Sequence, residues 1–157
     1  MKTVYLSVGS NICPQENIPS CLRILKKKFW VKKISSVYET APIGPAGTSK
    51  FWNLAVSIRT RLKKKDLEGQ LRSIEKKLLR LRHPANKFAP RTIDLDILPE
   101  PDYQHKAFVI IPLSEIAPDE VDPGSGKTFK ELAQAWNRNS KRIRKIDCKN
   151  RRRHRLL

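Results

Sequence analysis

Apolar and polar positions alternate in three stretches of the chain, which is the period of strands with one buried face. Two further stretches are interpreted as strands, residues 31–40 and the short apolar run at residues 108–111. The five strands predicted in this way cover residues 4–8, 31–40, 51–60, 92–98 and 108–111.

Elsewhere the apolar residues recur three or four positions apart, which predicts three helices. The first covers residues 14–29 and has prolines near its first turns. The second begins at a capping Asp66 and is stopped by His83-Pro84. Its apolar stripe consists of Leu67, Leu71, Ile74, Leu78 and Leu81. The third helix covers residues 128–136.

The predicted order of elements is β-α-β-β-α-β with additions, which is the ferredoxin-like plan. This plan is an α+β sandwich with a mainly antiparallel sheet, and we expect the helices to pack on one face of it. The 157 residues suit one domain. We predict that residues 1–137 form this domain and that residues 138–157 form a basic C-terminal tail.

The charge is strongly positive, with 33 Lys and Arg against 15 Asp and Glu. Residues 138–157 hold ten of these basic residues, one acidic residue and few apolar ones, so we expect a weakly ordered segment. Such a tail is suited to contact with nucleic acid, or it is a solvated tail without a partner. The charge on the rest of the chain favours anionic small substrates such as polyphosphates.

The cysteines and the apolar runs give no sign of export or of a membrane. Cys13, Cys21 and Cys148 form no Cys-x-x-Cys pair, and no His lies at a ligand spacing, so we expect reduced thiols. The apolar start of the chain is interrupted early and no cleavage pattern follows it. No apolar run has the length that spans a bilayer. We therefore expect a mature cytoplasmic protein.

The stretch from Arg91 to Leu98 places Asp94 and Asp96 on one face of a predicted strand. Like charges in such positions usually destabilise a sheet. Mg²⁺ relieves this repulsion, because one or two carboxylates together with substrate phosphates suffice to hold it. Two such ions align an in-line displacement. The alternative is a solvent-facing strand whose aspartates pair with nearby Lys or Arg.

Basic side chains cluster between the second helix and this strand, at Arg80, Arg82, Lys87 and Arg91. Guanidinium groups are suited to phosphate oxygens. The alternative is a solvated basic helix end, which the helix dipole favours. Arg80 and Arg82 point apart on a straight helix, so they converge only if the chain is already leaving the helix there.

Phe51 and Asn53 share one face of their predicted strand, and Trp52 takes the other. An aromatic ring beside a carboxamide is suited to a flat heterocycle. The alternative is a core aromatic residue and a surface Asn. The sequence from Gly124 to Thr128 looks like the end of a P-loop, but Val121 stands where its first glycine would be. We interpret it as a turn with Thr128 as the cap of the last helix.

Taken together, these motifs resemble the 6-hydroxymethyl-7,8-dihydropterin pyrophosphokinases of folate biosynthesis. The resemblance covers roughly residues 3–136, and the block from Lys87 to Leu98 is its most specific part. The other matching pieces, in order, are residues 8–11, 35–45, 51–56, 74–75, 108–113 and 115–118.

The resemblance implies a transferase that moves the β,γ-pyrophosphoryl group of ATP to the hydroxymethyl group of the dihydropterin and releases AMP. It implies two Mg²⁺ ions on Asp94 and Asp96, and no membrane partner; we further expect a monomer. No strong base is needed, because positioning and charge neutralisation carry most of the barrier.

The resemblance also implies roles for single residues. Arg80, Arg82 and Arg91 are the expected catalytic residues. The expected pterin-binding residues are Thr40, Ala41, Ile43, Phe51, Asn53 and Phe108. The expected ATP-binding residues are Glu75, Arg82, Lys87, Phe88, Arg91, Ile97, Tyr103 and Lys106.

The chain departs from the family pattern between the aspartate strand and Phe108. Only residues 99–107 make this connection, where family members have a short hairpin and a Pro-His element that contacts ATP; Pro101-Asp102 is the nearest match. One alternative is therefore a degenerate homologue that binds pterin or nucleotide without turnover. Another is a basic nucleic-acid-binding module, which would be indifferent to Asp96→Ala.

Overall fold

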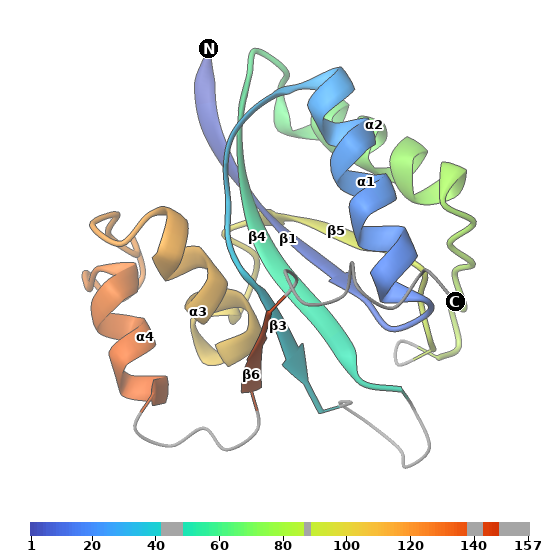
Figure 1. Ribbon diagram of the computed structural model, residues 1–157. Coiled ribbons are helices and arrows are strands. Elements are labelled where there is room, and N and C mark those ends of the chain that lie inside the picture. The colour runs from blue at the N-terminus through green and yellow to red at the C-terminus, as the bar shows by residue number, and fades with distance from the viewer. Residues whose placement is uncertain (42–48, 87–88, 138–142, 148–157) are drawn as a thin grey trace.

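The computed structural model describes residues 1–41, 49–86, 89–137 and 143–147, and these form one antiparallel sheet with helices on both faces (Figure 1). The strands are β1 (Lys2–Ser10), β2 (Trp30–Ile34), β3 (Val37–Thr40), β4 (Phe51–Thr60), β5 (Asp94–Leu98) and β6 (Ile143–Ile146). The helices are α1 (Pro14–Lys28), α2 (Lys64–Lys77), α3 (Ala107–Ile116) and α4 (Phe129–Asn137), with a short 3-10 helix at Tyr103–His105. None of the helices described is long and apolar enough to cross a membrane.

The sheet order is β5-β1-β4-β3-β6, and β2 also pairs with β4. Strand β1 lies in the centre and pairs antiparallel with both β4 and β5. Strands β2 and β3 follow one another along the far side of β4. This is the order that the β-α-β-β-α-β plan requires, so the predicted α+β, ferredoxin-like fold is confirmed.

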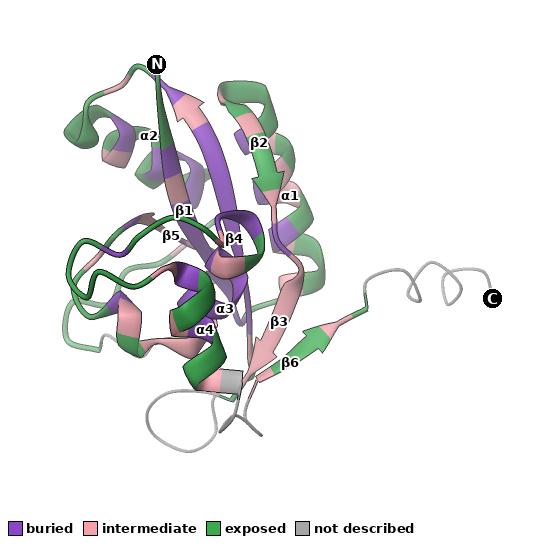
Figure 2. Cartoon of the chain, turned by 90° about the vertical axis from the view of Figure 1, so that its left-hand side faces the viewer, coloured by how far each residue is buried: buried purple, intermediate pink, exposed green. Residues whose placement is uncertain are grey.

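The two faces of the sheet bury different helices, because side chains alternate along each strand. Leu6 and Val8 of β1 belong to the core beneath α1 and α2. Tyr5, on the other face of β1, packs against the second core, which α3 and α4 cover. Figure 2 shows the buried residues along β1 and β4 between these layers. The expectation that all helices lie on one face is therefore wrong.

The predicted strand at 108–111 is wrong, because these residues lie in helix α3. Val109, Ile110, Ile111 and Leu113 are all buried. A segment that is apolar on every side has no polar face to reveal its period, so a buried helix and a buried strand look alike in sequence.

Helix α2 begins and ends earlier than its apolar stripe predicts. It starts at Lys64, and Asp66 lies in the first turn without capping it. It ends at Lys77, because Leu79 adopts the left-handed backbone conformation with φ 60°. Leu81 is therefore exposed instead of continuing the stripe.

The single strand predicted over residues 31–40 is divided into β2 and β3 at Ser35-Ser36. The Ser35 hydroxyl accepts a hydrogen bond from the backbone N–H of Ala55 (2.8 Å), and the Ser35 N–H donates to the Ala55 carbonyl (2.9 Å). Thr128 caps α4 as predicted, since its Oγ1 accepts from the N–H of Glu131 (3.2 Å) and the Glu131 carboxylate accepts from the Thr128 N–H (2.7 Å).

No secondary structure was expected after Trp136, yet Ile143–Ile146 form β6, which pairs antiparallel with β3. A short strand with two basic residues carries almost no signal of its own, and its pairing depends on the exposed edge of β3. The division into a domain over 1–137 and a tail over 138–157 stays a prediction, and residues 138–142 and 148–157 lie outside the described residues.

Candidate active site

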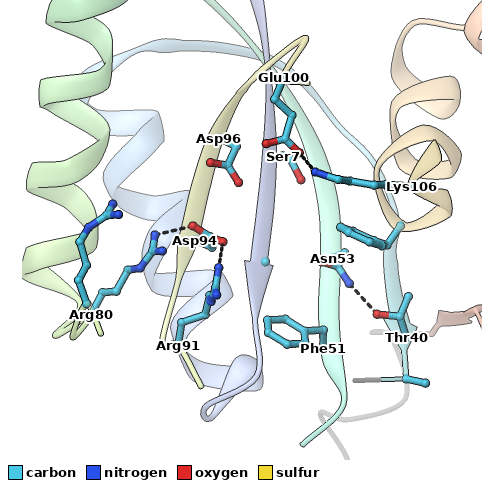
Figure 3. A pocket seen from close by; sticks show the side chains of 14 residues that line it. Ser7, Thr40, Phe51, Asn53, Arg80, Arg91, Asp94, Asp96, Glu100 and Lys106 are labelled. Atoms are coloured by element: carbon cyan, nitrogen blue, oxygen red, sulfur yellow. Dashed lines mark hydrogen bonds and ion pairs between the residues drawn. The ribbon is translucent and has the colours of Figure 1, made fainter. Parts of the chain in front are cut away.

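A cavity of about 490 Å³ opens beside helix α3, on the sheet face that carries α3 and α4 (Figure 3). Strands β5, β1, β4 and β3 all contribute side chains to it. The residues that line it are Ser7, Gly9, Thr40, Ala41, Phe51, Asn53, Arg80, Arg82, Arg91, Asp94, Asp96, Glu100, Lys106 and Phe108.

The register of the sheet brings these residues together from distant parts of the chain. Gly9 on β1 is the partner of Asn53 on β4 and of Asp94 on β5. Ser7, on the same face, is the partner of Asp96. Asp94 therefore lies across from Asn53 with only Gly9 between them, and Asp96 lies two residues further along β5, opposite Ser7.

Gly9 is required by this close approach. A Cβ atom at this position would lie 3.1 Å from Oδ1 of Asn53 and 3.9 Å from Cδ1 of Phe51. Gly9 belongs to the piece 8–11 that resembles the family, but neither Gly9 nor Ser7 was predicted as a site residue. A glycine within an alternating stretch is the signal that marks such close approach.

One half of the cavity is aromatic and carries amide and hydroxyl groups. Phe51 and Phe108 both line it, from β4 and from the first turn of α3. The Nδ2 of Asn53 donates a hydrogen bond to Oγ1 of Thr40 (3.0 Å), which fixes the orientation of the buried amide. Trp52 points the other way into the first core, so the predicted division of faces is confirmed.

The other half of the cavity is ionic, and its centre is the carboxylate of Asp94. Asp94 accepts hydrogen bonds from Arg80 and Arg91, as Figure 3 shows. The buried carboxylate of Glu75 accepts from Arg80 and also from Arg82 (2.7 Å). The side chains of Arg80 and Asp94 are only 10% and 19% exposed, so little solvent screens this pair.

Arg80 and Arg82 converge on Glu75 because α2 has already ended. The left-handed residue Leu79 turns the chain back, so that both guanidinium groups reach the same carboxylate. The sequence analysis predicted that Arg80 and Arg82 converge only if the chain has begun to leave the helix, and the structure meets this condition. Glu75 also accepts from the N–H of Leu95 (2.9 Å), which joins the end of α2 to β5.

Arg91 is held in place by Asn11, which the sequence analysis cited only as part of a motif. The Asn11 side-chain oxygen accepts from the N–H of Arg91 (2.8 Å), and the Asn11 N–H donates to the Arg91 carbonyl (3.1 Å). This exchange fixes the backbone just ahead of β5. Only the fold brings the two residues together, because 80 positions separate them in the sequence.

The acidic side chains concentrate negative charge at one point of the cavity. Burial raises the pKa of Asp96 to about 7, and repulsion from Asp94, Glu100 and Glu75 adds to this effect. Among the residues described, no three Asp, Glu, His or Cys side chains gather closely enough to bind a metal ion alone. Mg²⁺ is usually held by one or two carboxylates together with phosphate oxygens of a substrate. Asp94 and Asp96 fit the protein part of this donor set.

A second cavity of about 260 Å³ adjoins the first on the side of α2. Arg82, Asp96 and Glu100 line both cavities, and Ile97 lines the second one. Lys64, Glu68 and Arg72 of α2 also contribute to it. A ligand that occupied both cavities would pass beside the carboxylate of Asp96.

Four of the expected ATP-binding residues lie elsewhere or outside the description. Glu75 and Tyr103 are buried and line neither cavity; the Tyr103 hydroxyl donates to Asp122 in the second core. Lys87 and Phe88 lie outside the described residues. The expected pterin-binding residue Ile43 lies outside them as well. Lys106 lines the first cavity and pairs with Glu100 (2.7 Å), a residue that the sequence analysis missed.

The cavity thus places an acidic pair and three arginines next to an aromatic pocket edged by an amide. This arrangement, on a ferredoxin-like sheet, is suited to an enzyme that transfers phosphoryl groups to a flat heterocyclic substrate. Residues 5–118 match the family model described as 7,8-dihydro-6-hydroxymethylpterin-pyrophosphokinase (HPPK). The chain belongs to this family and is an ATP-dependent pyrophosphokinase.

Two curated relatives carry the name 2-amino-4-hydroxy-6-hydroxymethyldihydropteridine pyrophosphokinase. The one from Synechocystis is 36% identical over 91% of this chain and 75% of its own length. The one from Bacillus subtilis is 33% identical over 87% of this chain and 91% of its own length.

The HPPK-DHPS protein of Plasmodium falciparum has a similar fold, with a TM-score of 0.68 over 87% of this chain. The match spans 44% of that longer chain at 13% identity, so this likeness concerns the fold alone.

Proposed function

We propose that this cavity is where the chain transfers pyrophosphate from ATP to the hydroxymethyl group of 6-hydroxymethyl-7,8-dihydropterin, giving AMP and the dihydropterin diphosphate. The observation that carries this proposal is the direct contact between two unlike half-sites. Asn53 and Asp94 are both register partners of Gly9, so a ring bound at the amide has its substituent beside the carboxylates.

The aromatic half is suited to the pterin. Phe51 and Phe108 offer ring faces for stacking, and Asn53 and Thr40 offer a fixed set of donors and acceptors for the edge of the ring. Ala41 lines the same wall. Ile43, two residues further on, remains a predicted pterin contact.

The acidic half is suited to hold Mg²⁺ with ATP, and Asp94 and Asp96 would be the ligands, for two ions. When bound, these ions neutralise the triphosphate and favour an in-line displacement at the β-phosphorus. The protein residues must then exchange partners, because Asp94 is bound to Arg80 and Arg91 in the structure described here.

This exchange keeps the charges balanced. As ATP enters, the guanidinium groups of Arg80 and Arg91 leave Asp94 and bind phosphate oxygens, for which their planar donors are well suited. Arg82 is 60% exposed and can reach the triphosphate without losing a buried position. Glu75 then orients Arg80 and Arg82 without touching ATP itself.

The second cavity is suited to the nucleoside end of ATP. Ile97 offers an apolar contact, and Lys64 and Arg72 offer hydrogen-bond donors. Lys106 stands at the mouth of the first cavity, where it can bind a phosphate in place of Glu100. Lys87 and Phe88 remain predicted ATP contacts.

The hydroxymethyl group needs no strong base in this proposal. The chain binds both substrates in adjoining pockets, orients the hydroxyl group toward the β-phosphate and surrounds the transferred group with cationic side chains. Positioning and charge neutralisation of this kind account for most of the rate enhancement in phosphoryl transfer.

The test is AMP formation from ATP, Mg²⁺ and 6-hydroxymethyl-7,8-dihydropterin, with the wild type, Asp96→Ala and Asp119→Ala compared. We expect pterin-dependent AMP from the wild type and from Asp119→Ala, whose carboxylate is exposed and lines neither cavity. Asp96→Ala should form none. If folded wild-type protein binds both substrates without forming AMP, it is the degenerate homologue and the proposal is wrong.

A further inference from the structure

Strand β6 lies directly behind the wall of the cavity that carries Thr40. Thr40 is the last residue of β3, and its register partners are Phe51 on β4 and Ile143 on β6. Phe51 and Thr40 both line the cavity. The backbone that presents Thr40 to the substrate is therefore held between one strand of the core and one strand from the C-terminal segment.

Without β6, β3 would be a four-residue edge strand paired on one side only. Its pairing with β4 comprises three residue pairs, against four with β6. Short edge strands with unpaired backbone groups open locally at low free-energy cost. Strand β6 is the second of the two partners that hold the backbone of Thr40, whose hydroxyl accepts the hydrogen bond from Asn53.

Side chains on both sides fasten β6 to β3. Arg144 pairs with Glu39 (3.0 Å), and Lys145 pairs with Glu115 of α3 (3.4 Å). Glu115 also accepts from the N–H of Ser36 (2.8 Å), so the start of β3 is tied to the same carboxylate. Ile146 packs against the first core.

We propose that β6 is a positioning strand for the pterin, which sets the affinity of the cavity for that substrate by fixing Thr40 and Ala41. This inference rests on the proposed pterin role of that wall. The ATP half of the site is built from α2, β5 and the segments that flank β5 on both sides, and none of these pairs with β6. The effect of β6 should therefore fall on the pterin and not on ATP.

Two variants distinguish the effect of the strand pairing from the effect of the ion pairs. Arg144→Pro/Lys145→Pro removes both charges. It also removes the backbone N–H that faces β3, because successive residues of a strand point their N–H groups to opposite sides and one of these two must face β3. Arg144→Met/Lys145→Met removes the charges alone. Lys26→Met/Lys27→Met, on the exposed surface of α1, is the control for the lost charge.

We expect the proline variant to raise the KM for the pterin about three- to tenfold, the range for one lost hydrogen bond. Its KM for ATP should stay within about twofold. The methionine variant should raise the pterin KM by about twofold, because Arg144 and Lys145 are 74% and 60% exposed and such ion pairs contribute little. The α1 control should match the wild type.

Hydrogen–deuterium exchange at Tyr38–Thr40 tests the strand without turnover, and these amides should exchange faster in the proline variant. Faster exchange with an unchanged pterin KM would overturn the inference, as would an equal rise in both KM values. If the proline variant does not fold, Ile143→Gly must show the same selective rise. A wild type that forms no pterin-dependent AMP would instead overturn the proposed function, and this inference with it.

Discussion

Gly9 and Asn53 face each other on neighbouring strands so closely that a Cβ atom at Gly9 would lie 3.1 Å from Oδ1 of Asn53. Gly9→Ala should therefore displace the amide and break its hydrogen bond to Thr40. We expect the KM for the pterin to rise by about threefold to tenfold, as for the loss of one hydrogen bond. Steady-state kinetics with varied pterin at saturating ATP measures this change.

Gly69→Ala is the matched control for that prediction. Gly69 lies on the exposed surface of α2, and an added Cβ there meets nothing within 4 Å. It should leave the pterin KM unchanged and stabilise the protein by about 0.5–1 kcal/mol, because alanine is the better helix former. Equal kinetics for both alanine variants would show that the space at Gly9 is unimportant for binding.

The two aspartates of β5 should respond in opposite directions to loss of charge. Asp96 is half-buried, and this burial, together with the like charges of Asp94, Glu100 and Glu75, raises its pKa. In chelator at pH 8, Asp96→Asn should raise the free energy of unfolding by on the order of 1–3 kcal/mol. Asp94→Asn should lower it by about 3 kcal/mol, because Arg80 and Arg91 lose their shared carboxylate.

Urea denaturation of the two variants measures these stabilities, and both should lose AMP formation. If Asp96→Asn is more stable than the wild type but inactive, the Asp96 carboxylate is needed for activity and lowers the stability of the fold. If Asp96→Asn is instead as unstable as Asp94→Asn, Asp96 has a stabilising partner and the electrostatic picture of the cavity is wrong.

Asp122 should make stability fall in acid. Burial alone would raise the pKa of Asp122, but hydrogen bonds from Ser125 and Tyr103 outweigh it and lower the pKa below its usual value. The ionised carboxylate therefore stabilises the fold at any pH above the ordinary Asp pKa of about 3.9. This contribution is lost as the pH falls below that value, through the lower pKa of the folded state.

Asp122→Asn should consequently cost about 1–3 kcal/mol at pH 7. Ser125 N–H and the Tyr103 hydroxyl both donate to the carboxylate, and the NH2 group of an amide must face one of these donors. The difference from the wild type should shrink below pH 4. Chemical denaturation at several pH values measures it, with the exposed Asp119→Asn as the control. A difference that is constant from pH 7 to pH 3 would mean that the ionised carboxylate is not the stabilising form.

Leu79 adopts a left-handed conformation that an L-residue reaches only at a cost of about 1–2 kcal/mol. Its side chain is 77% exposed, so it gains little from burial. Leu79→Gly should therefore raise the free energy of unfolding by about 0.5–1 kcal/mol. Lys77→Gly, in the last turn of α2, should lower it by up to about 1 kcal/mol. If Leu79→Gly leaves the free energy of unfolding unchanged or lowers it, the left-handed conformation of Leu79 does not destabilise the fold.

The alternation of residues 51–53 and 94–96 predicted that Phe51 and Asn53 share a face and that Asp94 and Asp96 share a face, and all four line the cavity. This was possible because a strand fixes which side chains share a face. The same reasoning could not find Gly9, Ser7 or Asn11, whose neighbours in the sheet lie far away in the sequence. Which residues stand opposite them depends on the order and register of the strands. Local periodicity carries no information on either.

Phe108 shows a different limit. The resemblance predicts that it contacts the pterin, and it does line the cavity, but it lies in helix α3 and not in the predicted strand. The segment that follows it is apolar on all sides, so its period could not be recognised in the sequence. The four residues of β6 show a third limit. Their basic composition is typical of a disordered segment, and only the edge of β3 gives them a partner.

The pairing of Gly9 with both Asn53 and Asp94 also means that the cavity forms only after distant parts of the chain have paired. Its two half-sites come from strands that meet only when β5, made late in the chain, adds to β1 at the beginning. Such distant pairings close large loops and form slowly. A chain whose synthesis has stopped before β5 therefore lacks Asp94 and Asp96, and we expect it to bind nucleotide only after β5 has paired with β1.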